Sequence, residues 1–280
     1  SHWSIGRQSV AVPPPFIGIV ARRGPSDKSG RRPRPHPGSP AAVGLTVRHA
    51  VGARMLSAPR WLALEVKYLD RAVSFYEAFL DLSVRSRSDG EARLTVGETD
   101  LILRTPGPVP RGGLHTHFAL ATPVEEYSAW RDRLAERFDL TEREFGDYAS
   151  LYFYDVAGNC VEIGQRDVDG TGITGLFEVV FEVEALDAAT AFYTDLGFEV
   201  VDRGDERRRT RLTTGTVDLE LWEPQLGIAD ARGGVHVDLG VAADDPQAAA
   251  DAVADRATRV EKSESRTRIR DPDGHYVTLV

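Results

Sequence analysis

The sequence predicts an α+β fold made of four copies of one unit, in which a strand is followed by a helix and three more strands. An internal repeat is the first observation behind this prediction. The segment that starts at Arg93 returns at Arg211, a shift of 211 − 93 = 118 residues, and a repeat of this length indicates the duplication of a folded unit. The second observation is that short runs of alternating apolar and polar residues flank helical patterns, as half-buried strands do.

Each unit can be followed along the chain. In the first unit the pattern predicts a helix after Asp70 and strands at 61–66, 82–87, 91–96 and 99–104. The second unit starts at His115, with a helix at 124–137 and later strands at 141–145, 150–155 and 160–165. The third and fourth units follow the same order over 176–223 and 234–280.

The same pattern predicts the domain boundaries. Residues 1–54 are a basic, Pro- and Arg-rich tail, with nine Arg or Lys against one acid, and a tail without periodic apolar residues is expected to be disordered. Three interpretations of the tail are considered: a flexible basic arm, an expression-derived extension, or a product of translation from a start site placed too far upstream. The lone methionine, Met55, favours the last of these. An N-terminal domain is expected at 55–166, a linker at 167–175 and a C-terminal domain at 176–280.

The rest of the chain is acidic and poor in lysine. Residues 55–280 carry 34 − 9 = 25 basic and 43 − 1 = 42 acidic side chains, and their only lysines are Lys67 and Lys262. This composition favours a halophilic protein, with an ordinary acidic enzyme as the alternative. It argues against nucleic-acid binding by the folded part, because phosphate recognition needs a basic face. The single cysteine, Cys160, favours a cytoplasmic setting, and no apolar run is long enough to span a membrane.

Several motifs resemble one known family. Phe-Tyr pairs occur on the first helix of each half, at Phe75-Tyr76 and Phe192-Tyr193, and an Asp-Pro-Asp-Gly-His turn at 271–275 precedes the last strand. Together with the four units, these motifs resemble the vicinal oxygen chelate superfamily over about residues 60–280. That family includes glyoxalase I, methylmalonyl-CoA epimerase, fosfomycin- and bleomycin-resistance proteins, and the extradiol ring-cleaving dioxygenases.

The resemblance implies a fold and a chemistry. Two units pair into one cup, so the chain is expected to form two cupped mixed sheets with helices outside. A divalent metal inside the cup, held by the first and last strands of the units, chelates two adjacent substrate oxygens and stabilises a developing oxyanion. The four-unit layout implies a metal-dependent enzyme most like a ring-cleaving dioxygenase, acting on a small molecule with vicinal oxygens. The alternatives are a glyoxalase- or epimerase-type lyase or isomerase, or a metal-free small-molecule-binding module, and a homodimer is left open.

Strand alternation places candidate ligands at positions that the resemblance implies. In the third and fourth units Glu178, Glu220 and His236 fall on the predicted cup faces, with Thr278 where a fourth ligand is expected. One imidazole with two carboxylates suits an ion such as Fe(II), Mn, Zn or Ni.

The first and second units offer a different set. His117 and Glu162 match ligand positions, whereas Trp61 and Ile102 occupy the other two. His115 is a candidate for the missing ligand, because residues two apart on a strand share a face.

Other residues near these strands admit both functional and structural interpretations. Tyr152 and Tyr154 are candidate catalytic residues, as a phenol acid or a hydrogen-bond donor. If no metal binds, the acids of the third and fourth units would form a solvated face neutralised by arginines on neighbouring strands. His117 and Glu162 would then form only a buried hydrogen bond. Trp61 and Trp222 favour a metal-free cup, because aromatic walls hold flat ligands by stacking.

Overall fold

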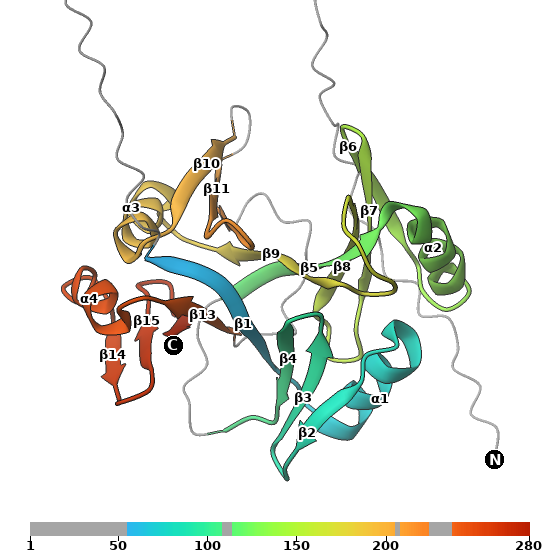
Figure 1. Ribbon diagram of the computed structural model, residues 1–280, viewed down its shortest axis with the longest axis horizontal. Helices are drawn as coiled ribbons and strands as arrows, with labels where there is room; N and C mark the ends of the chain where they lie inside the picture. The colour runs from blue at the N-terminus through green and yellow to red at the C-terminus, as the bar shows by residue number, and fades with distance from the viewer. Residues whose placement is uncertain (1–54, 108–113, 205–207, 224–236) are drawn as a thin grey trace, which may run out of the picture. The chain divides into compact units, whose positions relative to one another are not determined.

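The computed structural model describes residues 55–107, 114–204, 208–223 and 237–280. The predicted tail at 1–54 lies outside the described residues. The described chain has the predicted α+β fold, in which a strand, a helix and three further strands recur four times (Figure 1).

The bounds of the elements are as follows. The first unit comprises β1 (Leu56–Glu65), α1 (Leu69–Leu80), β2 (Val84–Arg87), β3 (Glu91–Val96) and β4 (Thr99–Arg104). The second comprises β5 (Leu114–Pro123), η1 (Val124–Glu126), α2 (Tyr127–Ala135), β6 (Thr141–Phe145), β7 (Tyr148–Tyr154) and β8 (Cys160–Arg166). The third comprises β9 (Gly175–Glu182), α3 (Leu186–Leu196), β10 (Glu199–Arg203), β11 (Arg209–Thr213) and β12 (Asp218–Trp222). The fourth comprises β13 (Val237–Ala243), α4 (Pro246–Asp251), β14 (Arg259–Lys262), β15 (Thr267–Arg270) and β16 (Tyr276–Leu279).

The strands form two eight-stranded sheets, and each sheet combines units from different halves of the chain. One sheet has the order β14-β15-β16-β13-β1-β4-β3-β2 and joins the first unit to the fourth. The other has the order β10-β11-β12-β9-β5-β8-β7-β6 and joins the second unit to the third. In both sheets the first strands of the two units meet antiparallel, β1 with β13 and β5 with β9 (Figure 1).

This topology corrects one expectation. Units that follow each other in the chain were expected to share a sheet, so that 55–166 and 176–280 would each form a cup, and that pairing is wrong. Within each unit, one edge of the first strand has no partner strand and must pair with another unit. The four first strands have similar alternation, so the sequence alone does not show which two of them pair. Which edges meet depends on the packing of whole units, and strand alternation does not encode it.

Consecutive units are nevertheless joined on the helix side of the sheets. Phe75 and Phe79 of α1 pack edge-on against Phe138, with ring centroids 5.5 and 4.9 Å apart. Phe138 in turn lies 5.2 Å from Phe153 of β7. The first and second units therefore share an apolar core although their strands belong to different sheets.

The two Phe-Tyr pairs have a structural explanation in buried hydrogen bonds. Tyr76 donates its hydroxyl proton to Asp155 Oδ2 at 2.7 Å, and Tyr193 does the same to Asp271 Oδ2 at 2.8 Å. The other oxygen of Asp271 accepts the backbone N–H of His275 at 2.7 Å. Each tyrosine thus ties a helix to the Asp-x-x-Gly turn of the next unit.

Tyr193→Phe is expected to lower the free energy of unfolding by about 1–3 kcal/mol, because it takes a donor from a buried carboxylate. Burial, followed by the charge of Asp271, raises the pKa of Tyr193 well above its ordinary value of 10.0. The folded chain therefore keeps this proton where the unfolded chain loses it, and the stabilisation declines above pH 10 by at most about 1.4 kcal/mol per pH unit. Urea denaturation from pH 8 to 11 should show that the difference in free energy of unfolding between wild type and Tyr193→Phe becomes smaller above pH 10. A constant difference would contradict a stabilising role for the Tyr193 hydroxyl proton.

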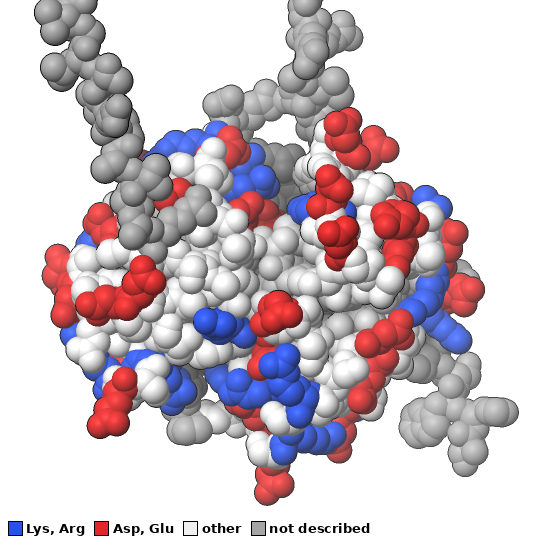
Figure 2. Space-filling model, in the orientation of Figure 1, with Lys and Arg blue, Asp and Glu red and all other residues white. Residues whose placement is uncertain are grey.

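Charged side chains of both signs are mixed over the face shown in Figure 2. Arg133 lies 2.6 Å from Asp81, and Arg256 lies 2.8 Å from Asp195. Exposed pairs of this kind contribute only about 0–1 kcal/mol each, so they affect hydration more than stability. Among the described residues, no helix combines the length and the apolar character needed to cross a bilayer.

Candidate metal centre

The sheet of the second and third units brings three ligating side chains together. His117 comes from β5, Glu162 from β8 and Glu178 from β9, which are neighbouring strands. Ala119 of β5 pairs with Glu162 on one side and with Glu178 on the other, so the two carboxylates flank β5 two residues from His117. All three side chains are buried, and their ligand atoms lie within 4.8 Å of one another.

The imidazole of His117 stands between the two carboxylates. Its Nε2 atom lies 3.2 Å from Glu162 Oε2 and 3.5 Å from Glu178 Oε1. Glu162 Oε2 has no hydrogen bond of good geometry to any described residue. A buried carboxylate oxygen without a well-formed hydrogen bond is unfavourable, and a bound cation would satisfy it.

The charges at this cluster are strongly perturbed. Burial lowers the pKa of His117, but contacts with Glu162 and Glu178 outweigh it and raise the pKa to about 10. Burial, followed by the charge of Glu220, raises the pKa of Glu178 to about 7. Burial also disfavours the ionised form of Glu162, yet His117, Ser150 and Tyr152 lower its pKa. The buried carboxylates thus favour a positive charge between them.

The donor set fits a divalent cation. One imidazole and two carboxylates are ligands that Zn, Mn, Ni and Fe(II) accept in proteins. A cation would replace the proton on His117, because metal binding requires the neutral imidazole. His117, Glu162 and Glu178 are the residues that would hold it.

The candidate ligands from both halves of the chain thus meet in one cup. Glu220 of β12 is buried and lies opposite Val180, the residue that also pairs with His117. His236 lies outside the described residues. In the other sheet Ala63 corresponds to Val180, because Ala63 lies opposite Ile102 as Val180 lies opposite Glu220. On its other side Ala63 pairs with Asp238. By register, therefore, Asp238 and not His236 is the counterpart of His117.

The backbone register of β5 shifts between its two histidines. His115 lies opposite Phe181, whereas His117 lies opposite Val180. The side chain of His115 lies outside the described residues, so its role as a ligand stays a prediction.

The two candidate tyrosines lie on β7. Tyr152 pairs with Glu162, is buried, and has its ring 5.5 Å from the His117 ring at a nearly perpendicular angle. Burial, followed by the charges of Glu162 and Glu178, raises the pKa of Tyr152 far above its ordinary value, so the phenol stays protonated. Tyr154 pairs with Cys160 and is 41% exposed. Tyr152 is thus the tyrosine in contact with the cluster.

The corresponding positions in the other sheet are filled or paired. Trp61 and Ile102 occupy two of them, and Trp61 lies directly over Gly240, where an added Cβ would come within 2.2 Å of the ring. Asp238 accepts a hydrogen bond from Thr278 Oγ1 at 2.8 Å. These contacts favour a structural role for the described residues of the second cup.

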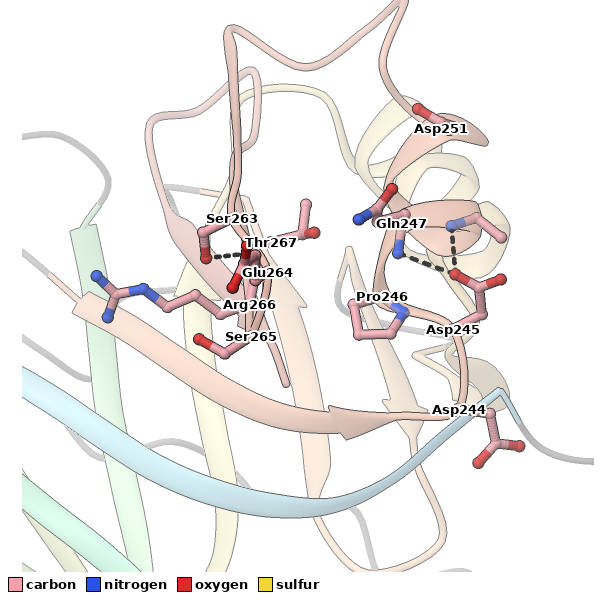
Figure 3. Close-up of a pocket in the computed structure, with 11 residues that line it drawn as sticks. Asp244, Asp245, Pro246, Gln247, Asp251, Ser263, Glu264, Ser265, Arg266 and Thr267 are labelled. Atoms are coloured by element: carbon pink, nitrogen blue, oxygen red, sulfur yellow. Dashed lines mark hydrogen bonds between the residues drawn. The ribbon is translucent and has the colours of Figure 1, made fainter.

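A hollow of about 420 Å³ lies beside α4 (Figure 3). Asp245 at its wall caps α4 by accepting the backbone N–H groups of Gln247 and Ala248. Asp251 lies 2.5 Å from Lys262 Nζ. These acids already have structural partners, so the chemistry of the molecule is better sought at His117.

Comparison with known proteins agrees with this fold. Residues 59–163 match the model of the Glyoxalase/Bleomycin resistance protein/Dioxygenase superfamily, and residues 178–280 match that of the Glyoxalase-like domain. The chain belongs to this superfamily, the vicinal oxygen chelate superfamily, in its two-domain form. No curated protein matches the sequence significantly.

Two solved structures illustrate the likeness. A Bacillus subtilis protein proposed to be a dioxygenase is 17% identical with a TM-score of 0.61, covering 81% of this chain and 86% of its own. Glyoxalase I from Zea mays is 19% identical with a TM-score of 0.58, covering 80% of this chain and 92% of its own. At these identities the likeness concerns the fold alone.

Sequence reasoning did not single out Ser150, a neighbour of the cluster, and named another neighbour, Trp222, only as an aromatic wall. Ser150, which is buried on β7, acts on the pKa of Glu162. Trp222 has its ring 5.6 Å from the His117 ring and donates Nε1–H to Glu220 at 2.6 Å. Alternation along β7 puts Ser150 on the face of Tyr152, and this signal could have found it.

Proposed function

We propose that this protein is a metal-dependent enzyme of the vicinal oxygen chelate type that acts on a small molecule with two adjacent oxygens. The observation that carries the proposal is the buried cluster of His117, Glu162 and Glu178, in which an imidazole stands between two carboxylates. A divalent cation bound there would act as a Lewis acid toward the substrate oxygens.

The donor set favours proton-transfer chemistry of the glyoxalase or epimerase kind. Non-haem iron oxygenases use two imidazoles and one carboxylate, whereas the described cluster contains one imidazole and two carboxylates. A carboxylate beside the cation, such as Glu178, is suited to accept a proton from a substrate carbon. Tyr152, whose phenol stays neutral beside Glu162, would donate a hydrogen bond to a substrate oxygen. A lyase or isomerase is therefore preferred to a ring-cleaving dioxygenase.

A metal-free binding protein is less well supported. Trp61, which would serve as a stacking wall, is packed over Gly240. Trp222 is engaged with Glu220. Neither indole is thus placed as an open wall for a flat ligand.

The test begins with the full chain purified without added metal or chelator and then titrated with Mn(II), Ni(II), Zn(II) or Fe(II). We expect one ion per chain. The loaded protein should exchange solvent deuterium into the carbon beside the carbonyl of a small α-hydroxyketone, measured by NMR, at least about 100-fold faster than the same protein in EDTA. Glu162→Gln should lower both binding and exchange.

Two outcomes would count against this function. If wild type binds none of the four ions, the metal-dependent reading is wrong. Oxygen consumption with catechols, in the absence of deuterium exchange, would assign ring cleavage in place of proton transfer.

A further inference from the structure

Glu220 occupies a last-strand position of the kind that the family resemblance assigns to a ligand, but both of its oxygens already have donors. Oε1 accepts from Arg211 Nε at 2.7 Å and from Arg209 Nη1 at 3.2 Å. Oε2 accepts from Trp222 Nε1 at 2.6 Å. Because the carboxylate is buried, these charge-assisted bonds compensate a charge that water cannot reach.

The other two carboxylates of the cup are held far less tightly. Glu178 lies 3.4 Å from Arg211 Nη2 and 3.5 Å from His117 Nε2, both longer than a good hydrogen bond. Glu162 Oε2 has no well-formed hydrogen bond within the described residues. Glu162 and Glu178 thus have oxygens available to a cation, whereas those of Glu220 are occupied.

Arg211 connects Glu220 to the candidate metal centre. It pairs with Glu220 across β11 and β12, and its Nη2 lies 2.7 Å from Glu220 Oε1 and 3.4 Å from Glu178 Oε2. Its side chain is 38% exposed, so part of the guanidinium reaches solvent. The arginine therefore carries a positive charge to the edge of the cluster.

The other sheet shows what an arginine at this position does without an acid opposite. Arg93 pairs with Ile102 as Arg211 pairs with Glu220. It contacts Glu91 at 3.1 Å instead, and it keeps with Asp100, at 3.7 Å, the contact that Arg211 makes with Asp218 at 3.8 Å. The acid opposite the arginine is thus what directs Arg211 toward the centre of its cup.

We infer that Glu220 is a positioning residue for Arg211 and not a metal ligand, and that three side chains, His117, Glu162 and Glu178, hold the cation. This inference rests on the proposed function. Three protein ligands leave coordination positions open for a substrate that binds through two oxygens. Arg211 supplies a fixed positive charge beside those positions.

Titration of the full chain with Mn(II), followed by electron paramagnetic resonance of the free ion, tests this assignment. Glu178→Gln should weaken binding by more than about 100-fold, as expected for a ligand. The double variant Arg211→Gln/Glu220→Gln, which removes one charge of each sign, should stay within about threefold of wild type. Arg211→Gln alone should bind about tenfold more tightly, because it releases Glu220 and removes a nearby positive charge.

The possible failures are distinguishable. If the double variant loses as much affinity as Glu178→Gln, Glu220 is a ligand and the inference is wrong while the metal site stands. If wild type itself binds no Mn(II), Ni(II), Zn(II) or Fe(II), the proposed function fails. Thermal melts in EDTA establish that each variant is folded. If the double variant does not fold, the single variant Arg211→Gln provides a second test. Weaker Mn(II) binding by Arg211→Gln than by wild type would also overturn the inference.

Discussion

Replacing His117 by alanine is expected to weaken Mn(II) binding by more than about 100-fold, measured by isothermal titration calorimetry. The imidazole is the only nitrogen ligand of the described cluster, and its Nε2 lies between Glu162 and Glu178. Without it, two buried carboxylates face each other with no positive group between them. Protonation then becomes the cheaper way to remove their charge, and it competes with the metal.

The chain provides a matched control for this variant. Asp238 holds the register position of His117 in the other sheet, is buried, and accepts a hydrogen bond from Thr278. Asp238→Asn should leave Mn(II) affinity within about threefold of wild type, because the second cup is structural. If Asp238→Asn abolishes binding and His117→Ala does not, the metal lies in the other cup and the proposed site is wrong.

Gly240→Ala is expected to lower the free energy of unfolding by about 1–3 kcal/mol, a large effect for one methyl group. Trp61 lies over Gly240 so closely that an added Cβ would come within 2.2 Å of the indole ring. The backbone and the ring must separate to make room, which disturbs the pairing of β1 with β13. Urea denaturation at neutral pH measures the loss.

Two further variants locate the cause of this effect. In a Trp61→Ala background the substitution at Gly240 should cost less than about 0.5 kcal/mol, because the clash is gone. Ala119 takes the place of Gly240 in the sheet of the candidate metal centre, where its partner is Glu178. Ala119→Gly should produce a smaller change than Gly240→Ala. Equal costs of Gly240→Ala with and without Trp61 would show that the contact is not responsible.

Part of the candidate site could be read from strand alternation. Period-two patterns put Glu162 on the cup face of its strand and Glu178 on that of another, because side chains alternate strictly along a strand. The register shift between His115 and His117 interrupts the strict alternation on which this rule rests. Alternation assumes an unbroken strand, and an irregularity in pairing leaves no clear mark in composition.

The engagement of Glu220 could not be read in the same way. Its place on the strand predicts a ligand, but whether its oxygens are free depends on Arg211, Arg209 and Trp222, which contact it across strands. Cross-strand contacts of this kind are fixed by register and rotamer. Neither is visible in the order of residues.

The sequence by itself determined the repeated unit, the α+β class and the superfamily, because these follow from local periodicity and short motifs. It also showed that Trp61 and Ile102 replace candidate ligands in one copy. Only the tertiary structure decided which units pair, and with that which candidate ligands lie in the same cup. Alternation predicted two incomplete ligand sets in separate cups, whereas the pairing of β5 with β9 brings His117, Glu162 and Glu178 into one. The physical reason is that a strand's faces are set by its own residues, while its neighbour is chosen by the packing of the whole chain.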